Sequence, residues 1–203
     1  MTSPAANYPK DLPLRDALTV SVRPIAAGDE DALLAFFGDI PEHERFFLKD
    51  EVTSPDLIRG SVRDAERPDP QPGPTARTAG RAFVLIALDA ERIVGEAALV
   101  RRRGKARSHL ADVRVIVAQD VRHHGLGTAL ISELCDIARD TGLSGVLFEA
   151  VEEAQAEALA AAEALGFTRL GRVYGGAIDP EGRLHDVVLL AMPVRRWRTA
   201  SYF

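Results

Sequence analysis

Residues 115–128 read Val115-Ile-Val-Ala-Gln-Asp-Val-Arg-His-His-Gly-Leu-Gly-Thr128, an apolar run followed by a short polar loop with two glycines. The apolar run predicts the end of a buried strand. Leu126–Arg139 predicts a helix, because its apolar residues recur at helical spacing. Gly125 and Gly127 allow the backbone to approach a ligand without an intervening Cβ. Since a helix N-terminus offers unpaired N–H groups and a partial positive charge, the stretch predicts a phosphate site.

This loop differs from the common nucleotide-binding patterns. Leu130 replaces the third glycine of G-x-G-x-x-G, which argues against a dinucleotide-binding module, and G-x-x-x-x-G-K-[ST] is absent. The pattern that remains is R-x-x-G-x-G over Arg122–Gly127. It resembles the pyrophosphate loop of the GNAT acyltransferases, which bind acetyl-CoA.

The sequence around the loop predicts one α/β domain. The strand at 110–117, the helix after the loop and a strand at 145–151 form a βαβ unit, which requires a parallel pair. The other elements favour antiparallel hairpins, so we expect a mixed, mostly antiparallel sheet with helices on both faces. Further strands are predicted at 12–15, 19–25, 83–88, 93–100, 168–173 and 187–192, and further helices at 29–38 (capped by Asp29), 54–65 and 154–165.

Composition limits the classes of function. The 203 residues include 25 basic and 30 acidic ones, and the net charge of -5 argues against a nucleic-acid partner. A single cysteine excludes an internal disulfide framework. No apolar run approaches the ~20 residues that cross a bilayer, and no signal core is present, so we expect a cytoplasmic protein without a membrane partner. His123 and His124 are adjacent and their side chains diverge, so no metal site is predicted.

Motifs elsewhere extend the resemblance to the GNAT family. Leu165-Gly-Phe167 matches a helix ending common in that family, and Val22-Arg-Pro-Ile25 resembles its first strand. The resemblance covers 19–193, including a Pro-rich connector at 66–80. Residues 1–18 are then an N-terminal extension and 194–203 a C-terminal tail.

A narrower resemblance concerns the catalytic domains of bacterial protein-lysine acetyltransferases. It rests on Tyr8-Pro9, Arg45-Phe-Phe47 and Ala111–Val117. The resemblance implies direct transfer of acetyl from acetyl-CoA to a primary amine, with a protein lysine as the narrower acceptor. It also implies a parallel strand pair, 110–117 and 145–151, that splays apart around the thioester. The residues that it assigns to the cofactor are Val115, Ile116, Val117, Arg122, His123, His124, Gly125, Leu126, Gly127, Thr128 and Gln155.

A general base is useful in such a transfer, because a lysine amine is neutral only about once in 2,500 molecules at pH 7. Asp112 matches the position where the lysine-acetylating relatives carry a glutamate, and Glu149 is a second acid at the splay. Structural roles remain open for both, as an ion pair with an arginine for Asp112 and a strand-end charge for Glu149. Arg122 in turn either contacts the cofactor or anchors the loop.

Two further expectations follow from the resemblance. The tyrosine that often protonates the departing thiolate is replaced by Ala162, so the prediction is an enzyme without a dedicated side-chain acid. A non-catalytic CoA-binding sensor or scaffold is the alternative function. An exposed sheet edge would favour a homodimer.

Overall fold

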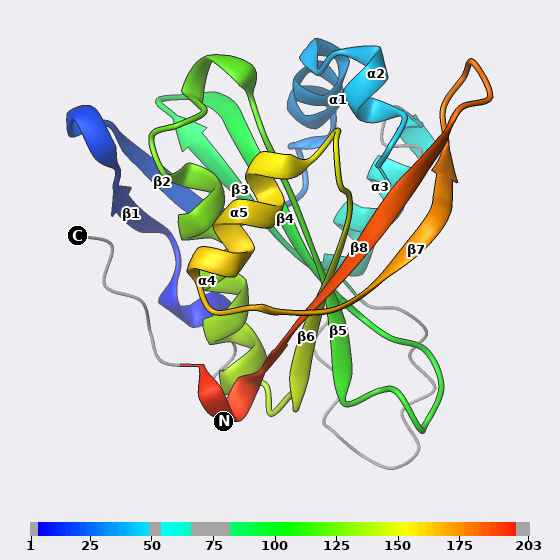
Figure 1. Cartoon of the computed structure of the whole chain (residues 1–203). Coiled ribbons are helices and arrows are strands. Elements are labelled where there is room, and N and C mark those ends of the chain that lie inside the picture. The colour runs from blue at the N-terminus through cyan, green and yellow to red at the C-terminus, as the bar shows by residue number, and fades with distance from the viewer. Residues whose placement is uncertain (1–3, 49–53, 66–81, 198–203) are drawn as a thin grey trace.

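The computed structural model describes residues 4–48, 54–65 and 82–197, which build one eight-stranded sheet in the order β1-β2-β3-β4-β5-β6-β8-β7 (Figure 1). The strands are β1 (Lys10–Pro13), β2 (Thr19–Pro24), β3 (Ala82–Asp89), β4 (Arg92–Arg101), β5 (Leu110–Val117), β6 (Gly145–Val151), β7 (Thr168–Ile178) and β8 (Leu184–Pro193). The α-helices are α1 (Glu30–Asp39), α2 (Glu42–Arg45), α3 (Pro55–Ala65), α4 (Leu126–Asp140) and α5 (Ala156–Ala164).

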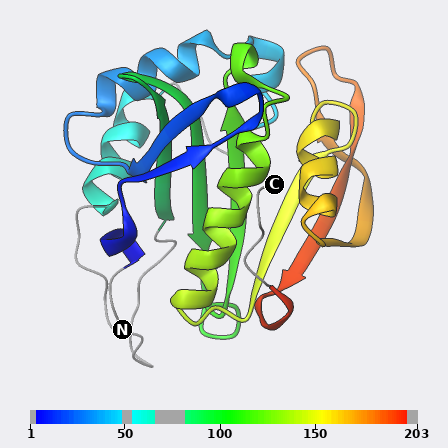
Figure 2. The same cartoon turned by 90° about the vertical axis from the view of Figure 1, so that its left-hand side faces the viewer.

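Helices cover both faces of the sheet. Helix α4 packs on β4 and β5, and α5 packs on β6, whereas α1 and α3 contact β4 and β3 from the opposite face. Figure 2 shows α4 running in front of the central strands. Alternation along β5 assigns its side chains to these faces: Ala111 and Val113 are fully buried, and Val117 lies beside Gly127 of α4. The intervening Asp112, Arg114 and Ile116 therefore face the other layer.

The central strands β5 and β6 pair in parallel over only half of their length. Their register runs from Leu110 opposite Gly145 to Val113 opposite Phe148 and ends there. Both strands continue, and each stays paired with its outer neighbour, β5 with β4 and β6 with β8. The two strands therefore splay apart beyond Val113.

This architecture confirms the predicted mixed sheet with one parallel pair. The sequence missed the one-turn helix α2, and it made the last two strands too short: β7 continues five residues past the predicted end at 173, and β8 begins at Leu184 rather than at 187. A register shift between Val173 and Ala177, at Gly175 and Gly176, lets β7 continue. The connector predicted at 66–80 lies outside the described residues.

The predicted side-chain cap of α1 is wrong. Asp29 occupies the N-cap position but forms no capping hydrogen bond. Its carboxylate accepts two hydrogen bonds of 2.7 Å from the Arg23 guanidinium and one of 2.8 Å from the backbone N–H of Ala26. A bidentate charge-assisted pair is stronger than a neutral cap, and it holds the pKa of Asp29 below its usual value.

Both ends of the described chain are fastened to α4. The buried Glu133 accepts hydrogen bonds from Tyr8 and from Lys10 of β1. At the other end, Trp197 is buried and its indole N–H donates to Asp136 at 3.0 Å. No helix in the described ranges has the length and apolar character needed to span a membrane.

Candidate active site

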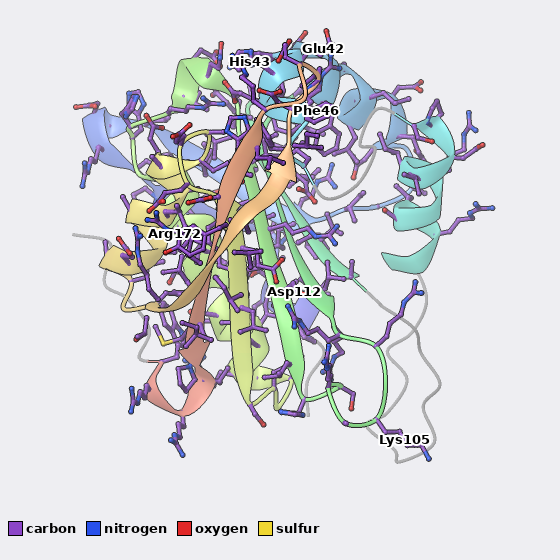
Figure 3. All side chains as sticks on the ribbon, turned by 45° about the vertical axis from the view of Figure 1, so that its right-hand side comes forward. Glu42, His43, Phe46, Lys105, Asp112 and Arg172 are labelled. Atoms are coloured by element: carbon purple, nitrogen blue, oxygen red, sulfur yellow. The ribbon has the colours of Figure 1, made fainter. Side chains whose placement is uncertain are left out.

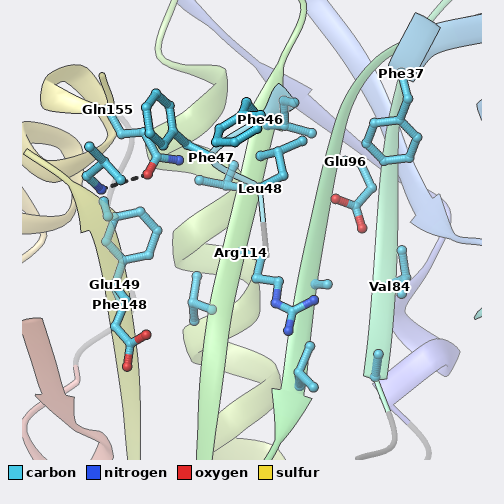
Figure 4. A pocket seen from close by; sticks show the side chains of 18 of the residues that line it. Phe37, Phe46, Phe47, Leu48, Val84, Glu96, Arg114, Phe148, Glu149 and Gln155 are labelled. Atoms are coloured by element: carbon cyan, nitrogen blue, oxygen red, sulfur yellow. Dashed lines mark hydrogen bonds between the residues drawn. The ribbon is translucent and has the colours of Figure 1, made fainter. Parts of the chain in front are cut away.

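A cavity of about 540 Å³ opens where β5 and β6 splay, on the face of the sheet that carries α1 and α3. Its walls are mainly apolar and include Phe37 of α1, Leu57 and Ile58 of α3, and Phe46 and Phe47, which follow α2. Figure 4 labels four polar side chains among them, Glu96, Arg114, Glu149 and Gln155. Within the described part of the chain the polar lining side chains are these four and Ser61.

Glu96 is the carboxylate of this cavity that the sequence analysis did not select. It lies on β4 opposite Ile116, beside the splayed half of β5. Burial raises the pKa of Glu96 from 4.5 to about 8, because the charged carboxylate loses hydration there. The signal was present in the sequence: Glu96 is the one charged residue within the apolar run Ile93–Val100.

Arg114 extends across the floor of the same cavity. It lies on β5 opposite Ala98, so it is a diagonal cross-strand neighbour of Glu96 on one face of the sheet. Figure 4 shows its guanidinium between Glu96 and Glu149. Burial lowers the pKa of Arg114, and the negative charge of Glu149 opposes that shift. The floor of the cavity thus carries a guanidinium between two carboxyl groups.

The predicted base Asp112 is bound in an ion pair. Arg102, just after β4, donates to both oxygens of Asp112 at 2.8–3.1 Å and to Glu149 at 3.1 Å. Asp112 lies on the paired half of β5, opposite Leu147, and does not line the cavity. Figure 3 shows Asp112 near mid-height in the view and Phe46, which lines the cavity, near the top. The structure thus has the arginine pair that the sequence left open for Asp112.

The predicted phosphate loop joins the end of β5 to α4. After the 3-10 turn Gln119–Val121, the chain reaches His123 at φ 66° and Gly125 at φ 91°, both in the left-handed region. A Cβ built on Gly125 would meet nothing within 4 Å, so it would enter open space at the N-terminus of α4. This conformation leaves the first amides of the helix available to an anion.

The side chains of this loop hold it in place. The Arg122 guanidinium donates to Glu44 of α2 and, through Nε, to the carbonyl of Val117 at 3.2 Å. The backbone carbonyl of His124 accepts from the N–H of Arg15 at 3.0 Å. His123 lies 3.6 Å from Glu157, and His124 lies 3.5 Å from Asp16, so the two imidazoles diverge.

The remaining predicted cofactor residues lie around the splay. Gln155 is the N-cap of α5, and its Oε1 accepts from the N–H of Val151 at 2.8 Å (Figure 4). Val115 and Ile116 line the cavity, and Val117 ends β5. Leu126 is buried, so only its backbone can face a ligand. In the described ranges, no three His, Cys, Asp or Glu side chains gather as a metal site.

Sequence comparison now identifies the family. The sequence model of the Acetyltransferase (GNAT) family matches residues 44–167, more than half of the chain. The chain belongs to the GNAT family. It is an acetyltransferase, and the matched residues include β5, the phosphate loop and β6. Among curated proteins, none matches this GNAT acetyltransferase.

Solved structures share the fold of this GNAT acetyltransferase. A GNAT-family acetyltransferase from Streptococcus pneumoniae is 19% identical with a TM-score of 0.70, over 86% of this chain and 99% of that one. The GNAT domain of S. lividans PAT is 20% identical with a TM-score of 0.67, over 91% and 96%. The yncA protein of Salmonella typhimurium, solved with its cofactor acetyl-CoA, is 17% identical with a TM-score of 0.72, over 90% and 98%.

Proposed function

We propose that this GNAT acetyltransferase transfers the acetyl group of acetyl-CoA directly to a primary amine in the cavity at the splay. The observation that carries this proposal is the position of Glu96, an acid with a pKa of about 8 that lines the cavity beside the splayed half of β5. Such an acid is suited to accept a proton from an amine near neutral pH.

The residues present fit acetyl-CoA. The left-handed Gly125 and the start of α4 form a cradle for a pyrophosphate, and we assign the amides of 122–128 to it. Beyond Val113, β5 has no β6 partner, so the backbone of Val115–Val117 can pair with an extended pantetheine arm. The bound thioester supplies the acyl group, and an N–H of this segment can stabilise charge on its oxygen. Gln155 borders the same opening.

Glu96 is our assignment for the general base, directly or through one water. It accepts the amine proton as the new carbon–nitrogen bond forms and the carbon–sulfur bond breaks, and water protonates the departing thiolate. A pKa of about 8 gives an appreciable fraction of carboxylate at neutral pH together with a useful basicity. Asp112 and Glu149 remain the alternatives, but both carboxylates are held in ion pairs with Arg102.

A matched pair of variants tests this assignment. We expect Glu96→Gln to lower kcat about 10²–10⁴-fold, the usual share of a general base, while calorimetry finds unchanged acetyl-CoA affinity. Asp112→Asn should change kcat less than Glu96→Gln does. If Asp112→Asn removes turnover and Glu96→Gln does not, the base is Asp112. A folded wild-type protein that binds acetyl-CoA but acetylates no amine would favour the sensor or scaffold alternative.

The acceptor follows from the resemblance more than from the cavity. A primary amine fits the reaction, and a protein lysine is the narrower proposal. A ribosomal-protein-alanine N-acetyltransferase from Brucella melitensis shares the fold at 20% identity, with a TM-score of 0.69 over 85% of this chain and 98% of that one. A panel of small amines and lysine peptides, read by thiol release, separates these acceptors. A cytoplasmic location and a homodimer along the exposed β7 edge stay predictions, the latter testable by light scattering.

A further inference from the structure

The helix α2 leads directly into one wall of the cavity but is too short to hold its own position. It has four residues, Glu42–Arg45, and the next three, Phe46, Phe47 and Leu48, line the cavity. Phe46 and Phe47 pack edge to face, and the Phe47 ring contacts the His185 imidazole of β8 with 5.2 Å between centroids. Because a single helical turn is unstable alone, the position of these aromatic side chains depends on what fixes α2.

Glu44 fixes α2 to the phosphate loop. Its Oε2 accepts from Nη2 of Arg122 at 2.5 Å, and its Oε1 accepts from Nη1 of Arg122 at 3.3 Å and from the Gln119 amide at 2.9 Å. The Glu44 and Arg122 side chains are only 22% and 25% exposed. The hydrogen bonds from Arg122 and Gln119 hold the pKa of Glu44 below its usual value. The pair is therefore charged and shielded in part from solvent.

Arg122 joins this contact to the site for the acyl donor. Its Nε donates to the Val117 carbonyl at the end of the splayed half of β5, while its backbone belongs to the loop assigned to the pyrophosphate. One guanidinium therefore contacts both the end of β5 and α2. A displacement of the loop would change the position of Glu44, and with it that of Phe46 and Phe47.

We propose that Glu44 is a positioning residue that couples the phosphate loop to the aromatic wall of the acceptor cavity. Acetyl-CoA that orders the loop then orders 44–48 through the Glu44–Arg122 pair, and so prepares the cavity for the amine. The inference rests on the proposed function for the identity of the two ligands. Linkage makes the effect reciprocal, so an acceptor in the cavity also strengthens binding of the donor.

Hydrogen exchange tests the coupling without turnover. The N–H groups of Phe46, Phe47 and Leu48 donate to Glu42, Glu44 and Arg45, so their exchange reports opening of this turn. In the wild-type protein, acetyl-CoA should slow hydrogen exchange of the amides in 119–128 and should slow that of 46–48 about tenfold. The tenfold figure corresponds to the lower end of the stability that a hydrogen bond to a charged group contributes. In the Glu44→Gln protein, acetyl-CoA should slow hydrogen exchange across 119–128 but not across 46–48. Equal slowing of 46–48 in both proteins would overturn the proposal.

Kinetics provide the second measurement. We expect Glu44→Gln to raise the acceptor KM about tenfold while the acetyl-CoA Kd changes less than threefold. In an Arg122→Gln background, Glu44→Gln should add a much smaller change, because only the hydrogen bond from the Gln119 amide then joins Glu44 to the loop. Asp120→Asn is the matched control, because Asp120 lies in the same 3-10 turn as Gln119 and its ion pair with Arg92 of β4 is exposed. This variant should leave the acceptor KM and the acetyl-CoA Kd unchanged.

The outcomes separate this inference from the proposed function. Equal losses of donor and acceptor affinity in Glu44→Gln would reduce Glu44 to a support of the loop and overturn the coupling. If acetyl-CoA binds the wild-type protein and slows hydrogen exchange across 46–48, but the protein acetylates no amine, the coupling holds and the proposed function fails. If the wild-type protein acetylates an amine and acetyl-CoA leaves hydrogen exchange across 46–48 unchanged, the proposed function holds and the coupling fails.

Discussion

Glu96 illustrates how one residue acquires a chemical property from its surroundings. A glutamate in water is ionised at neutral pH, whereas Glu96 lies in a mainly apolar cavity that penalises its charge. Asp112 has different surroundings, because Arg102 binds both of its carboxylate oxygens. The two acids are on neighbouring strands, but only the first has the environment expected of a proton acceptor.

The raised pKa of Glu96 predicts how stability depends on pH. The folded protein keeps the Glu96 proton up to about pH 8, whereas the unfolded chain releases it near pH 4.5. Between these values the folded state binds more protons, so this group should lower the free energy of unfolding as pH rises, by at most about 1.4 kcal/mol per pH unit. Urea unfolding of Glu96→Gln should lack this contribution. Identical pH profiles for the two proteins would contradict it.

Tyr174 and Ala162 test the absence of a side-chain acid. Tyr174 is 81% exposed on β7, and neither residue lines the cavity. We therefore expect Tyr174→Phe to change kcat less than twofold, because water protonates the thiolate. Ala162 is fully buried, so Ala162→Tyr should overpack the core and destabilise the fold by about 1–3 kcal/mol without a gain in rate. A hundredfold loss in Tyr174→Phe with intact acetyl-CoA binding would identify an acid.

At the scale of elements, the site depends on a strand that ends, a loop and a helix that begins. The loop has to reverse direction while it leaves the amides at the start of α4 available. Gly125 makes this possible because its φ of 91° is a backbone conformation that residues with a Cβ rarely adopt. Gly127 has no such constraint: a Cβ there would lie 3.8 Å from Val117, an ordinary contact.

The two glycines therefore predict different results for similar substitutions. Gly125→Val should weaken acetyl-CoA binding at least tenfold (about 1.4 kcal/mol), since the side chain strains the loop and enters the space of the anion. Gly127→Ala, the matched control, should bind nearly as the wild type does. Calorimetry measures both, with circular dichroism to verify folding. Unchanged affinity in a folded Gly125→Val protein would refute the assignment of this loop.

At the scale of the whole molecule, α4 connects the two ends of the described chain to the active site. Its N-terminus forms the phosphate loop, Glu133 in its middle binds Tyr8 and Lys10, and Asp136 binds Trp197. The segments outside the core strands thus help to hold the helix on which the loop depends. Their contribution is to stability, because neither Tyr8 nor Trp197 lines the cavity.

Trp197 allows a direct test of this contribution. Trp197→Ala removes a buried indole together with its hydrogen bond to Asp136, so we expect a loss of about 3 kcal/mol. For a chain of this size that lowers Tm by about 6–12 °C. The exposed Arg196→Ala is the control and should leave Tm nearly unchanged. Equal Tm values for the two variants would show that the tail does not stabilise α4.

Much of the fold could be predicted from local patterns. The buried strands and α4 have strong periodicity, and the glycine pair marks the loop, so the βαβ unit was predictable from residues 110–151. The one-turn helix α2 was not, because four residues have no periodicity of their own. The full length of β7 was also missed, since Gly175 and Gly176 resemble a strand end and only pairing with β8 carries the strand past them.

The sequence by itself determined the fold class, the family and the place of the phosphate loop, because these depend on short-range spacing along the chain. Only the tertiary structure decided which acid faces the cavity, since Glu96 and Asp112 both lie in apolar strands and differ in their neighbours. It also decided that Arg122 contacts Glu44, 78 residues away in the chain. Proton affinity and ion pairing depend on groups that meet in space, and their sequence separation carries no information about those meetings.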